Sequence, residues 1–321
     1  MFSPFRQKPE YQALRIELRN RRTFRSKNLQ LLRQGCYNLT TVWRHRLLYL
    51  HTGQLRDYVD YLSCRRAFGY PVTPRQHNKL MRYTLLPFPF RWFQAMYGIR
   101  AFRYQHLANL SDGSPDWRRR QQLNMQELSN TFIQRVQRAK SIIVVGNSAS
   151  LNSSNSGSFI DSHELVFRFN HCFAQPIAEQ TTGKKISYWV IAPDCQTPLR
   201  LTPEQCCVLS GPEILDWIKS TKALQHLTGQ NNTVQIPLAI WRELVVQLGA
   251  PPSSGLLILH WLFTLVTDKS VIQRIGFSAP EQFDQEHYHS ILPAHKGSAR
   301  HHWNMEWKLQ ETWFQSQLRL E

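Results

Sequence analysis

The sequence predicts an α/β fold, a Rossmann-like sheet with mixed or parallel strands flanked by helices and preceded by a basic, mainly helical region. Three observations predict it. From residue 141 onward, short β-branched runs alternate with helical segments, as they do where helices connect parallel strands. Residues 1–140 lack such runs and instead show helical segments broken by turn signals. The length of 321 residues suits one large α/β domain with an attached segment.

The expected elements follow in chain order. The N-terminal helices are interrupted by turn signals at 69–74, 86–90 and 111–116, and a polar helix follows over 117–140. Strands are expected at 141–145, 164–169, 186–192, 206–209, 234–238 and 271–277. Helices are expected at 255–266 and 305–318. The pattern divides the chain into a basic N-terminal region, 1–140, and an α/β domain, 141–321, with residues 111–115 as the best linker.

The composition excludes several classes of protein. With 42% hydrophobic and 12% aromatic residues the chain can bury a core, which excludes a disordered protein. No apolar run reaches the roughly 18–20 residues of a membrane span. The first residues, MFSPFRQKPE, hold no apolar segment like that of a secretory signal. We therefore expect neither anchor nor signal in this sequence.

Positive charge is confined to the N-terminal part. Residues 1–140 hold 26 Lys and Arg against 7 Asp and Glu, a net charge of +19, whereas residues 141–321 hold 13 against 15. Such a surplus is typical of proteins that meet polyanions: nucleic acid, an anionic membrane surface or a phosphorylated substrate. A well-solvated helical region explains it equally well.

The six cysteines show no metal-ligand spacing. Adjacent Cys206 and Cys207 fall in an apolar run that predicts a buried strand. We expect reduced thiols and a cytosolic setting.

The turn after the first predicted strand, Gly146-Asn147-Ser148, is the main candidate site. A dinucleotide fingerprint would need further glycines, and a hydrolase elbow with Ser148 as nucleophile would need Gly at position 150 and a helix directly after it. The sequence continues instead with a loop rich in Ser and Asn. Such a loop offers uncharged hydrogen-bond donors to a phosphate or nucleotide.

The longer segment VVGNSASLNSSNSGSFIDSHELVFRFN strongly resembles the large sialylmotif of glycosyltransferase family 29, the eukaryotic-type sialyltransferases. The positions that match this motif are Gly146, Asn147, Ser148, Gly157, Ile160, Asp161, His163, Val166, Arg168 and Asn170.

Three further motifs follow in the order of that family. The small sialylmotif resembles PPSSGLLILHWLFTLVTDKSVIQRIGFS, through Pro252, Ser253, Ser254, Gly255, Gly276 and Phe277. The third motif resembles His287-Tyr288-His289-Ser290, although Ser290 stands where an acidic residue is common. The very small motif, His and then Glu five residues later, matches His301 and Glu306.

The resemblance implies a GT-A-variant fold and an inverting transfer of sialic acid from CMP-sialic acid to a glycan hydroxyl. No metal or other cofactor is expected, and the chain has no Asp-x-Asp motif. His301 is implied as the general base, with the adjacent His302 as its rival.

The other roles are implied by the same match. His287 would hold the donor phosphate with help from Tyr288. The remaining donor-binding positions are Asn147, Ser148, Asn170, Ser253, Ser254, Gly255 and Gly276. Asp161 and Glu306 would support the site.

Two departures from the family point to a soluble, bacterial-like member. The bridge between the large and small motifs that is common in the family is absent, because Ser141 stands near the first cysteine position and the small motif has none. No anchor or stem precedes the motifs. We therefore expect a cytoplasmic protein, peripheral on the inner membrane face where residues 1–140 meet anionic lipid.

The motifs leave the acceptor, the linkage and the exact donor open. The acceptor is expected to be a glycan or glycolipid, and CMP-Kdo is the alternative donor. From other classes, a nucleic-acid-binding protein and a Ser148 hydrolase compete with this interpretation. The first lacks any nucleic-acid-binding motif, so no nucleic acid is expected as partner.

Overall fold

The computed structural model describes residues 16–34, 38–70, 115–170, 179–192, 201–211, 232–279 and 301–318, with a few isolated positions between them. The predicted breaks at 86–90 and 111–114 lie outside these residues, as do His287 and Tyr288.

Three helices of the N-terminal region, α2 (Arg21–Arg33), α3 (Leu39–Thr52) and α4 (Leu55–Ala67), form what we call the N-terminal bundle. Asn20 and Asn38 cap the first two, because each side chain accepts a hydrogen bond from an N–H in the first helical turn. Helix α3 ends at Gly53, whose φ of 62° is left-handed and suits glycine.

Helix α8 (Pro115–Arg138) leads into a sheet of six parallel strands. The strands are β1 (Ile142–Val145), β2 (Leu165–Phe169), β3 (Tyr188–Ile191), β4 (Cys206–Leu209), β5 (Thr233–Gln235) and β6 (Ile272–Ile275). Their order is β5-β4-β3-β2-β1-β6. The chain therefore moves outward from β1 on one side and returns to its other side as β6. In open α/β sheets, ligands bind outside the carboxyl ends of the strands at such a reversal.

Further helices complete the fold. They are the 3-10 helix η1 (Ala149–Ser153), α9 (Gly157–Ser162), α10 (Glu179–Thr182), α12 (Leu238–Leu248), α13 (Ser254–Leu265), the 3-10 helix η3 (Lys269–Val271) and α14 (Trp303–Leu318).

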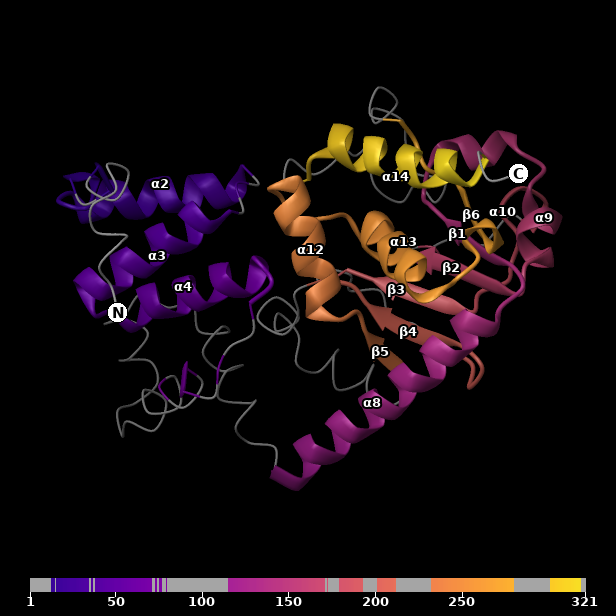
Figure 1. Ribbon diagram of the computed structural model, residues 1–321, viewed down its shortest axis with the longest axis horizontal. Coiled ribbons are helices and arrows are strands. Elements are labelled where there is room, and N and C mark those ends of the chain that lie inside the picture. Colours follow the sequence, from indigo (N-terminus) through magenta and orange to yellow (C-terminus); the bar gives the residue numbers. More distant parts are fainter. Residues whose placement is uncertain are drawn as a thin grey trace.

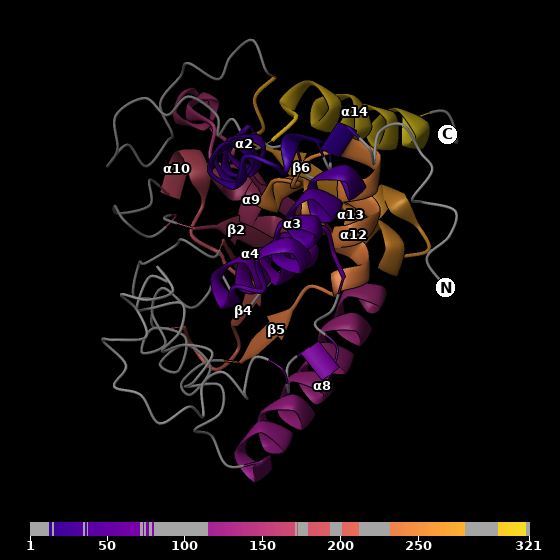
Figure 2. The same ribbon diagram turned by 90° about the vertical axis from the view of Figure 1, so that its left-hand side faces the viewer.

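Helices cover both faces of the sheet (Figures 1 and 2). On one face, buried side chains of α8, α12 and α13 pack with alternate residues of β1 such as Ile142 and Val144. On the other face, Ile143 and Val145 pack against Leu151 of η1 and Ile160 of α9. Burial on both faces explains why the strands appear in the sequence as continuous apolar runs.

The N-terminal bundle lies beside α12, as Figure 1 shows. The indole Nε1 of Trp241 in α12 donates a hydrogen bond of 2.7 Å to the carbonyl oxygen of Ala67 at the end of α4. Arg242 lies over the ring of Tyr70, with its guanidinium carbon 5.6 Å from the ring centroid. Because α12 starts three residues after β5 ends, this contact places the end of α4 at the carboxyl edge of the sheet.

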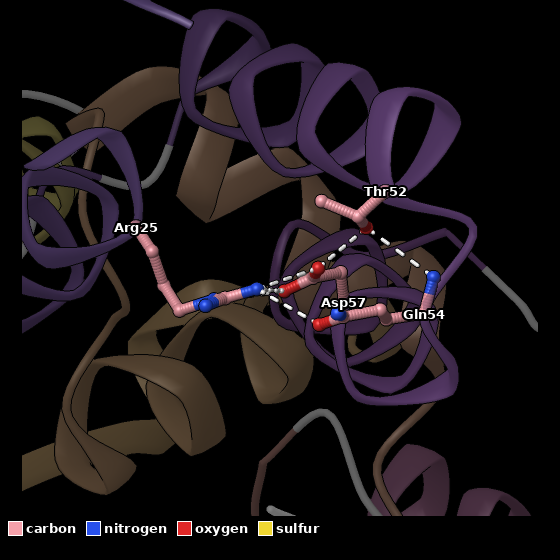
Figure 3. Close-up of polar contacts among 4 residues, drawn as sticks. All are labelled: Arg25, Thr52, Gln54 and Asp57. Carbon is pink, nitrogen blue, oxygen red and sulfur yellow. Dashed lines mark hydrogen bonds and ion pairs between the residues drawn. The ribbon is translucent and has the colours of Figure 1, made fainter. Parts of the chain in front are cut away.

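A buried carboxylate, Asp57, holds the bundle together (Figure 3). Its Oδ1 accepts hydrogen bonds from Arg25 Nε at 3.0 Å and Nη2 at 2.9 Å, and Nη2 also lies 2.8 Å from Oδ2. Thr52 Oγ1 donates to Oδ2 at 2.6 Å. The carboxylate thus joins α2, the end of α3 and α4 with paired, charge-assisted bonds.

The structure confirms the predicted α/β class and the helical N-terminal region. The predicted strand 234–238 is shorter than expected, because Pro237 caps α12 and has no N–H to donate to a ladder. The predicted strand 271–277 covers only 272–275, and the last helix begins at Trp303. The division at residue 140 stays a prediction. Phe132 of α8, just before it, stacks on Trp261 of α13 with centroids 4.5 Å apart.

Among the described helices, none combines the length and apolarity needed to cross a bilayer.

Replacing Asp57 by Ala should lower the free energy of unfolding by about 2 kcal/mol, because Arg25 and Thr52 lose a buried charged acceptor. The matched control is Glu179→Gln, which breaks an ion pair with Lys184 whose side chains are 64% and 68% exposed. That change should cost well under 1 kcal/mol. Urea unfolding followed by circular dichroism measures both, and equal losses would contradict the role given to Asp57.

Candidate active site at the carboxyl edge of the sheet

Two turns meet where the strand order reverses, one after β1 and one after β6. Gly146 N donates to the carbonyl oxygen of Ile275 at 2.8 Å, and Ser148 N donates to that of Gly276 at 3.0 Å. A Cβ atom on Gly146 would lie 2.2 Å from the Gly276 oxygen, so only glycine fits this approach. Gly276 has a φ of 71°, which also favours glycine. The predicted residues Gly146 and Gly276 therefore build the contact between the two turns.

Three serine hydroxyls form a directed cluster on these turns. Ser148 Oγ accepts from Ser278 Oγ at 2.5 Å and from Ser150 N at 3.2 Å, so both of its lone pairs are used. Its own proton is then available to Ser150 Oγ, at 2.9 Å, or to a ligand. In either case the cluster directs a hydroxyl proton outward from Ser148 or Ser150. The edge thus offers a donor, as an anionic ligand requires.

Asn170 follows β2 with a φ of 44°, a left-handed conformation that Asn tolerates better than most residues. Its backbone oxygen accepts from Trp189 Nε1 at 2.8 Å, and its side-chain Oδ1 accepts from Ala192 N at 2.8 Å. These bonds fix the amide orientation and leave the Nδ2 amino group as the donor suited to a ligand. Asn147, half-buried, lies in the neighbouring turn between Gly146 and Ser148.

The first turn of α13 carries Ser253, Ser254 and Gly255. Ser254 Oγ lies 2.7 Å from Ser210 Oγ, and Ser210 Oγ donates to the carbonyl oxygen of Ile191 at 2.9 Å. Because that carbonyl can only accept, the single Ser210 proton is used there, and Ser254 must donate to Ser210. Ser254 therefore presents acceptor lone pairs.

Gly255 allows α13 to approach the turn after β6. A Cβ atom there would lie 2.8 Å from Cε1 of Phe277. The two parts of the predicted small motif, separated by α13 in the sequence, thus touch in the structure.

Glu306 connects α13 with α14. Its side chain is 1% exposed, and it accepts hydrogen bonds from Ser253 N at 2.8 Å and from Ser253 Oγ at 2.5 Å. Burial raises the pKa of Glu306 to about 7, and the two hydrogen bonds from Ser253 act in the opposite direction.

The adjacent histidines differ in their surroundings. His301 Nδ1 lies 2.7 Å from the carbonyl oxygen of Pro251 and 3.8 Å from Glu306 Oε1. His302 Nδ1 lies 2.7 Å from the carbonyl oxygen of Leu248. A carbonyl only accepts, so both rings carry their proton on Nδ1 when neutral, and both Nε2 atoms are basic. His301 also lies beside the carboxylate of Glu306, which can stabilise the protonated imidazole ring.

Arg274 of β6 holds α14 in place. Its Nη1 donates to Gln310 Oε1 at 2.9 Å, and its Nη2 pairs with Glu311. The guanidinium also lies over the rings of Trp307 and Phe314, at 4.7 and 4.9 Å from their centroids. The helix that carries Glu306 is therefore fixed on the strand that leads to the Gly276 turn.

Asp161 lies apart from these turns. Its carboxylate accepts from the backbone N–H groups of Lys184 and Lys185 at 2.8–3.0 Å, which supports the segment before β3. The supporting role of Asp161 in the site stays a prediction. His287 and Tyr288 lie outside the described residues, so their place is not part of this geometry.

The described residues contain neither a cluster of metal ligands nor a disulfide. Within the described part of the chain, no three His, Cys, Asp or Glu side chains lie close enough to hold a metal ion. Five of the six cysteines are described, and none of these forms a disulfide. Burial raises the pKa of the Cys206 and Cys64 thiols to about 12.

The site includes residues that local sequence patterns did not indicate: Ser150, Ser210, Ser278 and Arg274. Ser210 follows a buried strand at the carboxyl edge, and this position was the one available signal. Ser278 and Arg274 act through contacts between distant segments, whereas Ser150 bonds to Ser148 in the same turn.

Part of the chain matches a known protein family. Residues 116–244 match the model of glycosyltransferase family 29 (sialyltransferase). Two crystal structures of a mammalian sialyltransferase, one in complex with Gal-beta-1-3GalNAc-ortho-nitrophenol, match with 18% sequence identity and a TM-score of 0.40. The match covers 67% of this chain and 82% and 83% of those chains. No curated protein matches the chain.

The family match spans the turn after β1 and four further strands of the sheet, and over these residues the chain is similar to glycosyltransferase family 29 (sialyltransferase).

Proposed function

We propose that this enzyme transfers sialic acid from CMP-sialic acid to a hydroxyl of a glycan or glycolipid, with inversion and without a metal ion or other cofactor. The observation that carries the proposal is the contact of His301 with Glu306, which in turn caps the helix that begins at Ser253. An imidazole oriented beside a carboxylate, at the edge where the donor-binding turns meet, suits a general base.

In the proposed step, the acceptor hydroxyl attacks the anomeric carbon of the sialyl group. Nε2 of His301 takes the hydroxyl proton as the new bond forms. The bond to the CMP phosphate breaks, and CMP leaves as an anion. His287 and Tyr288 are proposed to hold that phosphate, and the serine cluster and Asn170 to donate hydrogen bonds to the CMP part.

The α13 turn would bind the other parts of the donor. Ser254 presents acceptors, which suit hydroxyl groups of a sugar or the amino group of cytosine. Ser253 is already engaged with Glu306, so we propose that it positions the turn and that its contact with the donor is through the backbone.

We further propose a cytoplasmic enzyme that is peripheral on the inner membrane face, with residues 1–140 in contact with anionic lipid. The motifs give no reason to expect nucleic acid as a partner. Among its described contacts, the Ser148 hydroxyl bonds to other serines instead of an imidazole, which favours ligand binding over the hydrolase alternative.

The direct test is incubation with CMP-sialic acid and a panel of acceptor sugars, with products identified by mass spectrometry. CMP-Kdo serves as the alternative donor. Transfer of Kdo alone would overturn the proposed donor, and no transfer from either, with no binding of CMP in calorimetry, would overturn the function.

Replacing His301 by Ala should lower kcat about 10²–10⁴-fold, because the proton of the acceptor hydroxyl loses its acceptor. CMP binding measured by calorimetry should persist. His302→Ala is the matched control, since its Nδ1 makes a similar bond to a carbonyl, and it should retain most activity. The opposite result would make His302 the base.

Replacing Glu306 by Gln should lower kcat about tenfold, because the neutral amide stabilises a protonated His301 by roughly 1.4 kcal/mol less. The pH profile gives a sharper measurement. With a pKa of about 7, Glu306 gains its proton as pH falls through neutrality, and the support for the imidazolium is lost. The plot of kcat against pH for the Glu306→Gln variant should therefore lack the part of its fall at acidic pH that protonation of Glu306 causes. A fall at acidic pH unchanged in position and steepness would contradict this role.

Chelation with EDTA should leave transfer unchanged, since we assign no step to a metal ion. Activity is measured before and after dialysis against the chelator. Loss of turnover that Mg²⁺ or Mn²⁺ restores would contradict the proposal.

A further inference from the structure

Helix α3 exposes two leucines, Leu39 and Leu50, although it belongs to the most basic part of the chain. Leu39, Trp43, Arg46 and Leu50 recur at helical spacing and fall within one narrow stripe of the helix surface. Leu39 is 51% exposed and Leu50 is 63% exposed, whereas the opposite face of α3 is buried against the bundle. We call these four residues the α3 stripe. A solvent-facing helix surface is ordinarily polar, so the two exposed leucines favour an apolar partner.

The stripe has a defined internal arrangement. The guanidinium carbon of Arg46 lies 4.7 Å from the centroid of the Trp43 ring. Leu39 lies one turn before this pair and Leu50 one turn after it, so the stripe is about 16 Å long at 1.5 Å per residue. The stripe thus combines apolar side chains, which can insert into a membrane, with a positively charged guanidinium. Helices that lie in a membrane interface have this composition.

The charge around the stripe favours an anionic partner. Residues 16–70 hold 11 Lys and Arg against 3 Asp and Glu. Two of the three acids are already engaged within the bundle: Glu17 pairs with Lys27 and Arg44, and Asp57 pairs with Arg25. Residues 16–70 therefore keep a net positive charge that can attract an anionic partner. Of the six large hydrophobic side chains that are exposed in the described part of the chain, three lie here: Ile16, Leu39 and Leu50.

We infer that the α3 stripe docks on an anionic lipid surface, with its leucines and Trp43 at the level of the headgroups and the basic side chains of the bundle held by lipid charge. A nucleic acid would use the charge but not the exposed leucines. The inference rests on the proposed contact of residues 1–140 with anionic lipid, which it assigns to one surface of the bundle, and its purpose would be to bring the site to a lipid-linked acceptor. The docking itself is independent of catalysis.

The test is flotation of the full chain with vesicles of phosphatidylcholine alone or with phosphatidylglycerol added. The protein should float with the anionic vesicles, stay behind with the neutral ones and be released by 0.5 M salt, because salt screens the attraction. The double variant Leu39→Ser, Leu50→Ser should bind at least tenfold less. Arg46→Glu, a second variant with an unchanged apolar face at the two leucines, should also bind less.

The matched control is Val246→Ser. Val246 is 64% exposed, as Leu50 is, but it lies on α12 outside the bundle, and its replacement should leave flotation unchanged. Transfer to a free acceptor sugar should be the same in all variants. A failure of docking and a failure of the proposed transfer reaction are therefore distinguishable. Undiminished flotation of the double variant, or equal flotation with neutral vesicles, would overturn the inference. Salt-sensitive binding to DNA without flotation would assign the surface to nucleic acid.

Discussion

The site depends on one buried carboxylate. Glu306 is on α14, near the C-terminal end of the chain, and both of its oxygens are held by Ser253, the residue that caps α13. A carboxylate with 1% exposure is stable only where donors replace water, and Ser253 supplies a backbone N–H and a hydroxyl. The same carboxylate lies 3.8 Å from His301 Nδ1. The Glu306 carboxylate therefore fixes the start of α13, the position of α14 and the surroundings of the His301 ring. Arg274 holds α14 on β6, which keeps Glu306 in contact with Ser253.

The order of the strands explains why distant motifs come together. Because β1 is bordered by β2 on one side and β6 on the other, the turns after residues 145 and 275 become neighbours. Each turn has a glycine where the other approaches: Gly146 has no room for a Cβ, and Gly276 adopts a positive φ. The serines that follow, Ser148 and Ser278, are thereby placed within hydrogen-bond distance. The close approach of two backbones thus converts two unrelated polar turns into one surface.

The strands can be predicted from the sequence because each depends on the side chains of its own short segment. The run at 206–209 coincides with β4 because strands buried on both faces appear as short apolar runs bounded by polar residues. The predicted strand 234–238 extends beyond β5 because apolar Leu238 continues the apolar pattern, although Pro237 already caps a helix. Within the candidate site, Ser148 and Glu306 could be named from the sequence because the order of the motifs along the chain resembles a family. Ser210 and Arg274 could not be, because their roles come from pairings with Ser254 and Gln310 across the fold, which no local pattern encodes.

The position of the N-terminal bundle gives its charge a structural context. Its last helix is joined to α12 by the bond between Trp241 and the Ala67 carbonyl, and α12 begins close to where β5 ends. In a parallel sheet all strands end at one edge, so the bundle and the ligand-binding turns share that edge. A basic region attached at the opposite edge would hold a charged surface away from the chemistry. Attached here, it lies on the same side of the sheet as the candidate site, and any surface that the bundle binds is brought toward the side that carries His301.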